Sequence, residues 1–435
     1  MTKTTNEREL ALAVLLSVLK EGAPAHLALR NILEKYQYID KKERAFVTRV
    51  VEGTLEHLIE IDYIIDQFSK VKSAKMKPVI CMILRISVYQ MKYMDHVPDS
   101  AVCNEAVKLA KKKGFQSLAG FVNGVLRNIG RNLSSITYPK EPKSLCWSVQ
   151  YSMPEWIIDK WLLAYSEDTV KTILQDIQRE KPTCIRFDPD KISKEDLTNR
   201  LLAEGVEKAE EHPLLPYALL ISGYDYLGFL ESFEEGLFYV QDASSMMAVE
   251  SLPVKSGDYI IDVCAAPGGK ALHAAEKLAG TGHVEARDLT EYKVGLLKEN
   301  IERCGMRNVE AVRMDALVYD EASCEKADIV IADLPCSGLG VLSGKKDIRY
   351  RMTEKQTTEL SQLQRKMLSV VKDYVKPGGC LLYSTCTINR EENEENTAWF
   401  LGEYPEFVLE KEKQYLPGID PCDGFYLAVL KKQES

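Results

Sequence analysis

Apolar residues recur at helical spacing through the first third of the chain. One row contains Leu12, Leu15, Leu16 and Leu19, and a second occupies 25–33. Further helices are predicted at 43–58, 60–69, 76–93, 99–112 and 116–130. His96-Val97-Pro98 breaks the pattern, and Asp99 is expected to cap the helix that follows. Because strand-like alternation is absent, residues 1–140 are predicted to form an all-α domain.

The pattern changes after this helical part. Segment 131–152 has no sustained periodicity and contains two prolines, which predicts a linker. Pro154 is expected to open one long helix that reaches about Gln178. Strands at 183–187 and 217–221, with a helix at 194–203 between them, predict a small α+β domain. The linker and this domain together occupy 141–235.

Apolar runs alternate with helical segments from about Leu237 to the end of the chain. Strands are predicted at 259–263, 283–287, 309–313, 328–332 and 379–384, with a further strand at 424–430. This βαβ alternation is typical of a Rossmann-like, doubly wound parallel sheet, which we assign to 236–435.

Three of these strands end in residues that carry chemistry. Cys336 follows one strand in Asp333-Leu-Pro-Cys-Ser, Cys386 follows another in Tyr383-Ser-Thr-Cys, and a glycine-containing loop spans 264–270. Open α/β sheets bind their ligands at the carboxyl ends of the strands. Most of the eleven cysteines are expected to be small buried apolar residues, but these two strand ends predict a nucleophile beside a nucleotide-like cofactor.

Two acidic residues extend the predicted cofactor site. Asp288 and Asp315 each follow the next strand along the chain, and a carboxylate at the end of the second strand suits a ribose diol. A glycine turn alone is weak evidence, because tight turns need glycine too. The loop, Asp288 and Asp315 at three successive strand ends are together stronger evidence for a cofactor site than the glycine turn alone. The Gly-x-Gly-x-x-Gly fingerprint is missing, which disfavours an NAD-linked dehydrogenase.

The distribution of charge and the spacing of the cysteines indicate which partners and which cellular compartment to expect. The net charge is −9, divided as +8 over 1–140, −9 over 141–235 and −8 over 236–435. The basic run Lys111–Lys113 could attract phosphates, although a solvated helix face is an equal alternative. The cysteines are scattered without metal-ligand spacing, which predicts reduced thiols, no metal and a cytoplasmic protein. We expect no signal peptide and no membrane span.

The motifs resemble those of a known family. Asp262-Val-Cys-Ala-Ala-Pro-Gly-Gly-Lys270, Asp333-Leu-Pro-Cys-Ser-Gly338 and Ser384-Thr-Cys386 are similar to motifs of RNA (cytosine-5) methyltransferases. Phe121-Val-Asn-Gly-Val-Leu-Arg-Asn128 resembles the NusB-like RNA-binding domain fused to RsmB (Sun/Fmu) type 16S rRNA enzymes. The resemblance covers nearly the whole chain, and it implies RNA binding by both the 1–140 and 141–235 domains.

The resemblance also implies roles for residues. Cys386 would attack C6 of cytosine, and Cys336 would assist release of the methylated product. The implied cofactor is S-adenosyl-L-methionine, bound by Cys264, Ala265, Ala266, Pro267, Gly268, Gly269, Lys270, Asp288, Asp315 and Asp333. Residues 264–270 would hold the methionine part, Asp288 the ribose and Asp315 the adenine side. Ala271 and Leu334 depart from the family pattern.

The RNA itself is expected to present an unpaired or extruded base. The basic loop Lys345–Arg351, just after Cys336, is predicted to contact phosphates and stack on a base, with an ordinary surface loop as the alternative. Ribosomal RNA of the small subunit is the favoured partner. A transfer-RNA methyltransferase and a non-catalytic RNA-binding assembly factor stay open as alternatives, as does the oligomeric state.

Overall fold

The structure is a computed structural model that describes residues 6–36 and 39–434. The chain divides into two compact units. The first unit is the chain up to Gln178 together with Leu342–Thr353, and the second is the remainder. The predicted boundaries after residues 140 and 235 stay predictions about smaller domains within these units.

The first unit is helical, as the periodicity predicted. Leu12 and Leu15 of α1, Val51 of α3 and Ile83 of α5 lie on the apolar faces of three helices and pack into one buried core. The elements are α1 (Glu7–Glu21), α2 (Ala25–Lys35), α3 (Lys41–Glu56), α4 (Leu58–Phe68), α5 (Pro78–Tyr93), α6 (Asp99–Lys112), α7 (Ala119–Asn132), α8 (Lys143–Tyr151), α9 (Glu155–Ala164), α10 (Glu167–Ile177) and α16 (Ile348–Arg351), with 3₁₀ turns η1 (Ser73–Lys75), η2 (Gln116–Leu118) and η3 (Leu133–Ser135).

Three local predictions for this unit were wrong. Asp99 is the first residue of α6 and not its cap, a position that Pro98 occupies. The predicted linker 131–152 contains the helix α8. The single long helix is two helices, because the Ser166 hydroxyl accepts a hydrogen bond from the Thr169 N–H (3.3 Å) and starts α10 as a new N-cap.

The segment Leu342–Thr353, here called the return segment, completes the helical unit. The Arg349 guanidinium is buried and donates to the carbonyl oxygens of Tyr151 and Ser152, both at 3.4 Å. The Tyr350 hydroxyl donates to the Ser152 carbonyl at 3.0 Å. These donors satisfy backbone acceptors at the end of α8, so the return segment is built into the unit as a structural element.

This packing corrects the predicted phosphate-binding loop. Arg349 and Tyr350 direct their polar atoms to buried carbonyl groups and are not available to phosphates or bases. Lys346 forms an ion pair with Glu56 at 2.7 Å. Lys345 is exposed. Of Lys345, Lys346, Arg349 and Tyr350, it is the one whose side chain stays available for the predicted phosphate contact.

The second unit begins with a small antiparallel sheet of strand order β2-β3-β1-β4. Ile185 and Leu219 of this sheet pack against Leu197 and Leu201 of α11. The sequence predicted β1, β3 and α11 but missed β2 and β4. The elements are β1 (Thr183–Phe187), α11 (Lys194–Ala203), β2 (Lys208–Glu211), β3 (Ala218–Ser222), η4 (Leu227–Phe229), α12 (Glu231–Glu234) and β4 (Phe238–Val240).

A seven-stranded sheet of order β10-β11-β9-β8-β5-β6-β7 forms the rest of the second unit. Strands β9, β8, β5, β6 and β7 are parallel, whereas β11 and β10 add an antiparallel edge. The sequence predicted β11 as a strand but not its antiparallel direction, and it missed β10. The strands are β5 (Tyr259–Asp262), β6 (His283–Asp288), β7 (Val309–Arg313), β8 (Ala327–Asp333), β9 (Val375–Thr385), β10 (Phe407–Tyr415) and β11 (Phe425–Lys432). The other elements are α13 (Ala243–Glu250), α14 (Gly269–Lys277), α15 (Glu291–Arg303), α17 (Glu354–Val371) and α18 (Glu394–Glu403), with 3₁₀ turns η5 (Glu321–Ser323), η6 (Lys372–Tyr374) and η7 (Arg390–Glu392).

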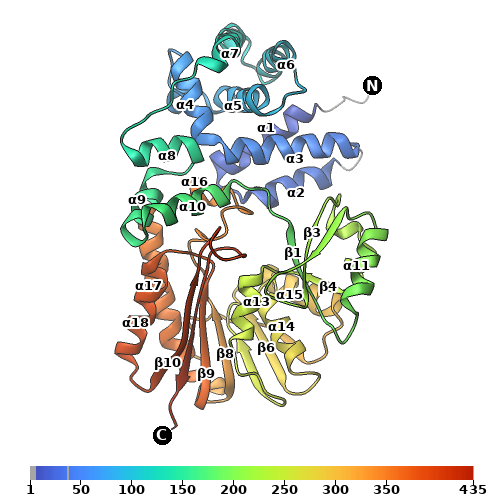
Figure 1. Ribbon diagram of the computed structural model, residues 1–435, viewed down its shortest axis with the longest axis vertical. Coiled ribbons are helices and arrows are strands. Elements are labelled where there is room, and N and C mark those ends of the chain that lie inside the picture. Colours follow the sequence, from blue (N-terminus) through green and yellow to red (C-terminus); the bar gives the residue numbers. More distant parts are fainter. Residues whose placement is uncertain (1–5, 37–38, 435) are drawn as a thin grey trace. The chain divides into compact units, whose positions relative to one another are not determined.

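Alternating residues of this sheet bury its two faces against different helices. Ile329 and Ile331 of β8 point to the core shared with α13, α14 and α15, whereas Val330 and Ala332 point to the core shared with α17 and α18. Figure 1 shows α17 and α18 on one side of the sheet and α13 and α14 on the other. The strand order reverses between β5 and β8, since β6 follows β5 on one side and β9 follows β8 on the other. Such a switch point opens a crevice beyond the strand ends, where ligands bind.

Candidate active site

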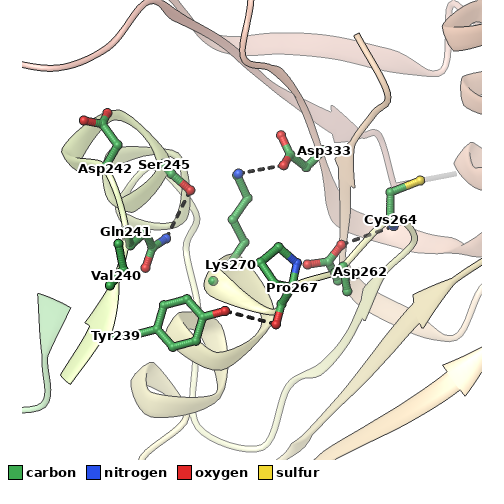
Figure 2. A pocket seen from close by; sticks show the side chains of 13 residues that line it. Tyr239, Val240, Gln241, Asp242, Ser245, Asp262, Cys264, Pro267, Lys270 and Asp333 are labelled. Atoms are coloured by element: carbon green, nitrogen blue, oxygen red, sulfur yellow. Dashed lines mark hydrogen bonds and ion pairs between the residues drawn. The ribbon is translucent and has the colours of Figure 1, made fainter. Parts of the chain in front are cut away.

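The loop after β5 lies at the switch point and is held on both sides. Gly268 has φ +120°, a conformation that residues with a Cβ rarely adopt, and it precedes the first turn of α14. The carbonyl oxygen of Pro267 accepts a hydrogen bond from the Tyr239 hydroxyl at 3.0 Å (Figure 2). The same oxygen accepts from Asn300 Nδ2, also at 3.0 Å. The loop backbone is therefore fixed before any ligand binds.

A pocket of about 540 Å³, a volume that includes open solvent at its mouth, lies above this loop. One wall comes from β4 and the start of α13, where Gln241 Nε2 donates to the Ser245 hydroxyl at 3.1 Å. Buried Arg186 of β1 orients this amide by donating to Gln241 Oε1 at 2.8 Å. The lining residues are Tyr239–Asp242, Ser245, Asp262, Cys264–Pro267, Gly269, Lys270 and Asp333.

Two acidic side chains at strand ends line the pocket. Asp333, at the end of β8, accepts from Lys270 Nζ and from the Ser384 hydroxyl, each at 2.8 Å (Figure 2). Asp262, at the end of β5, is buried; its Oδ1 accepts from the Cys264 N–H at 3.4 Å, and its Oδ2 has no hydrogen-bond partner among the described residues. Burial first, and then the charge of Asp333, raise the pKa of Asp262 to about 8.

This donor set fits S-adenosylmethionine. An unsatisfied buried carboxylate beside a second one favours a ligand that carries positive charge, which the cofactor's sulfonium and ammonium groups would supply. The N-terminus of α14 offers backbone N–H donors to its polar groups.

Asp288 and Asp315 lie outside the pocket lining. Asp288 is buried at the end of β6, where one oxygen accepts from the Ala266 N–H at 3.1 Å and the other pairs with Lys293 at 3.0 Å. Asp315 follows β7 and accepts from the Leu317 N–H at 2.9 Å. In this structure Asp288 positions the loop and Asp315 stabilises a turn, and their contacts to ribose and adenine stay predictions.

The two strand-end cysteines lie together. Their Sγ atoms are 3.2 Å apart, both are free thiols, and the Cys386 N–H donates to Cys336 Sγ at 3.2 Å. They meet because β8 and β9 are neighbours in the sheet, with Asp333 opposite Ser384. The pKa of Cys336 is raised well above its ordinary value, first by the contact with Cys386, then by burial and nearby negative charge.

Sequence reasoning missed six residues of the pocket: Tyr239, Val240, Gln241, Asp242, Ser245 and Asp262. Asp262 looks like the polar end of a buried strand, and only the pairing of β5 with β8 brings it beside Asp333. Gln241 and Ser245 lie upstream of the first predicted strand of the sheet. The motif Gln241-Asp242-Ala-Ser-Ser245 is the sequence signal that could have placed these two residues in the pocket.

Two further features bear on the kind of site. Among the residues that the structure describes, no three His, Cys, Asp or Glu side chains are grouped so that they could hold a metal ion. Across the same residues, no helix has the length and apolar character needed to span a membrane.

Fold and pocket together define a Rossmann-like methyltransferase. A solved structure designated methyltransferase homolog protein from Pyrococcus horikoshii matches with a TM-score of 0.58 and 25% identity, over 67% of this chain and 99% of that one. The crystal structure of PH0851 matches with a TM-score of 0.85 and 26% identity, over 99% of both chains.

Family comparisons identify the branch of this class. Residues 249–431 match the family described as 16S rRNA methyltransferase RsmB/F, 5–131 match the NusB family, and 153–224 match the RsmF/B-like ferredoxin-like domain. "Probable ribosomal RNA small subunit methyltransferase B" of Bacillus subtilis (strain 168) is 34% identical over 450 residues, which covers 99% of this chain and all of that protein. The chain belongs to the RsmB/F family of small-subunit ribosomal RNA methyltransferases.

Proposed function

We propose that this protein methylates C5 of a cytosine in 16S ribosomal RNA, with S-adenosyl-L-methionine as the methyl donor. The observation that carries the proposal is the pair of thiols, Cys336 and Cys386, 3.2 Å apart at the ends of adjacent strands. Asp333 lines the pocket from the same strand end, so the thiols and the proposed cofactor site share one edge of the sheet.

A thiol is needed because C5 of cytosine is a weak nucleophile. Bonding of Cys386 Sγ to C6 would make C5 enamine-like, which splits one difficult step into two easier ones. The cofactor supplies an electrophilic methyl group when it is bound. After C5 has gained the methyl group, its proton passes to water, the C5=C6 double bond forms again and Cys386 leaves C6 as a thiolate. We assign Cys336 to assist this elimination.

We propose that the cofactor is held by the loop after β5 and by acidic residues at the ends of the parallel strands. Residues 264–270 would contact the methionine part, with Asp262 and Asp333 facing its positive charge. Asp288 and Asp315 are proposed to serve the ribose and the adenine side. Asp333 could also contact the cytosine edge, where an acid stabilises charge that develops on the ring.

The substrate class follows from family membership and from access. A base within an A-form helix cannot reach a pocket, so the target cytosine should be unpaired or extruded. The family description names 16S rRNA, and the NusB match supports RNA binding by the helical unit. A transfer RNA or another RNA is the second candidate. A cytoplasmic location fits ribosomal RNA as the substrate.

The test uses labelled S-adenosylmethionine with 16S rRNA, transfer RNA and small ribosomal subunits, followed by detection of 5-methylcytosine. Label in 5-methylcytosine of 16S rRNA is expected; label only in transfer RNA would favour the second candidate, and none in any RNA would leave a binding factor. Cys386→Ala should abolish turnover, whereas Cys336→Ala should accumulate a protein–RNA adduct. An adduct trapped by Cys386→Ala would show that the two roles are reversed.

A further inference from the structure

One buried carboxylate, Glu392, accepts hydrogen bonds from the chain next to Cys336. Glu392 lies in η7 and has no exposed surface. Its oxygens accept from the Ser337 N–H (2.8 Å), the Ser337 hydroxyl (2.5 Å), Gln364 Nε2 (3.1 Å) and Asn389 Nδ2 (3.0 Å). All four partners are donors, which suits an ionised carboxylate and leaves the group fully satisfied.

The Ser337 hydroxyl extends this contact to the second cysteine loop. Ser337 directly follows Cys336, and Thr387 directly follows Cys386. Their hydroxyl oxygens are 2.8 Å apart, and both side chains are buried. Because the Ser337 hydroxyl donates to Glu392, its oxygen is left to accept from Thr387. A continuous chain of hydrogen bonds therefore runs from Glu392 through both residues that follow the thiols.

Asn393 fixes the second loop from the other side. Its Nδ2 donates to the Thr387 carbonyl oxygen at 3.0 Å, and its Oδ1 accepts from the Thr385 hydroxyl at 2.5 Å. Cys386 lies between these two threonines, so its backbone is held before and after the thiol. Adjacent residues of one short segment, Glu392 and Asn393, thus hold the loops of both cysteines.

The charge of Glu392 acts on the same pair. The contact with Cys386 and burial are the larger causes that raise the pKa of Cys336, and the carboxylate adds to them. Cys336 is therefore kept as a thiol near neutral pH. A protonated Cys336 at 3.2 Å can donate to Cys386, which suits a thiol that assists a neighbouring nucleophile and does not compete with it.

We propose that Glu392 is a positioning residue that sets the spacing of the two thiols and so allows Cys336 to assist release of the product. The assignment of release to Cys336 rests on the proposed function. The spacing itself does not, and it can be measured without RNA.

The test compares Glu392→Gln with Glu395→Gln, the same change at an exposed position of α18. Phenylarsine oxide forms two As–S bonds with neighbouring thiols and releases water, so its affinity reports their spacing. Wild type and Glu395→Gln should bind phenylarsine oxide with equal affinity, and Cys336→Ala should not bind it at this site. Glu392→Gln should bind it at least about tenfold more weakly than wild type. Unchanged affinity in Glu392→Gln would overturn the proposal.

Turnover with RNA supplies the second readout. Glu392→Gln should accumulate the protein–RNA adduct expected of Cys336→Ala, with the dissociation constant for S-adenosylmethionine unchanged. Wild-type turnover, or lost turnover without an adduct, would refute a role in product release. If wild type methylates no RNA, the proposed function fails while the arsenical measurement still decides the spacing.

A gentler variant covers the case in which Glu392→Gln does not fold. Ser337→Ala removes the hydroxyl that links Glu392 to Thr387 but keeps the Ser337 N–H bond. The same weakening of arsenical binding is expected. Wild-type affinity in Ser337→Ala would overturn the proposal.

Discussion

Replacing Asp262 by Asn should abolish a proton release that accompanies cofactor binding. Asp262 is buried beside Asp333, and its Oδ2 has no hydrogen-bond partner among the described residues. Its pKa is raised to about 8, so about nine in ten molecules carry the proton at pH 7. A bound sulfonium or ammonium group favours the ionised form, so binding should expel that proton.

The magnitude follows from the pKa. Binding should release about 0.9 proton at pH 7 and about 0.1 proton at pH 9. Below pH 8 the affinity for S-adenosylmethionine should rise nearly tenfold for each pH unit, because only the ionised fraction of Asp262 is ready to receive the cation. Above pH 8 this dependence should level off.

Isothermal titration calorimetry in phosphate and in Tris measures the release directly. The two buffers differ in ionisation enthalpy, so a released proton makes the observed enthalpy depend on the buffer. Asp262→Asn should remove this dependence, whereas Asp190→Asn, at an exposed turn of the same unit, should keep it. Equal enthalpies in both buffers for wild type at pH 7, or release that persists in Asp262→Asn, would refute the reasoning.

The same carboxyl group affects stability without ligand. Its pKa in the folded protein lies above the ordinary value of 3.8, so the folded state binds the proton more tightly than the unfolded chain. This contribution is fully present below about pH 4 and is lost as the pH rises through about 8, to a total of about 6 kcal/mol at most. The difference in the free energy of unfolding between Asp262→Asn and wild type, measured with urea, should grow over that interval in favour of the variant.

Three further changes test the framework around the site. Gly340→Ala would place a Cβ 2.0 Å from the Gly424 carbonyl oxygen and should cost about 2 kcal/mol or more in urea unfolding, whereas Gly344→Ala, with open space, should cost little. Arg349→Ala removes the donor to the carbonyl oxygens of Tyr151 and Leu342 and should destabilise the helical unit by about 2–3 kcal/mol in the same assay. Replacing Lys111–Lys113 by Glu should weaken RNA binding in a filter assay and leave cofactor affinity unchanged; unchanged RNA affinity would exclude this surface.

Much of the fold was predictable because its signals are local. Helical periodicity marked the first unit, and buried apolar runs marked the parallel strands. Strand β10 was missed because six consecutive residues, Val408–Lys413, are exposed and four of them are charged, as suits a sheet edge. The break before α10 depends on one capping hydroxyl, that of Ser166, within a pattern that is otherwise continuous.

The site was predictable only as far as neighbouring strand ends can be inferred. That the two cysteines follow strands was readable, but their 3.2 Å separation needs β8 and β9 to be adjacent. The raised pKa of Asp262 likewise arises from a partner 71 positions away in the chain, Asp333. Arg349 and Tyr350 were misread because a basic, aromatic segment has the same composition whether it contacts phosphates or buried carbonyl groups.

The return segment has a consequence for how this protein can be dissected. A fragment that ends at Gln178 would encode the helices but lack Leu342–Thr353, and the Ser152 carbonyl would lose two of its donors. A helical module exchanged between relatives by a single crossover would inherit the same defect. Swapping it intact requires three junctions, one after Gln178 and one on each side of the return segment, so the two units should be inherited and expressed as a matched pair.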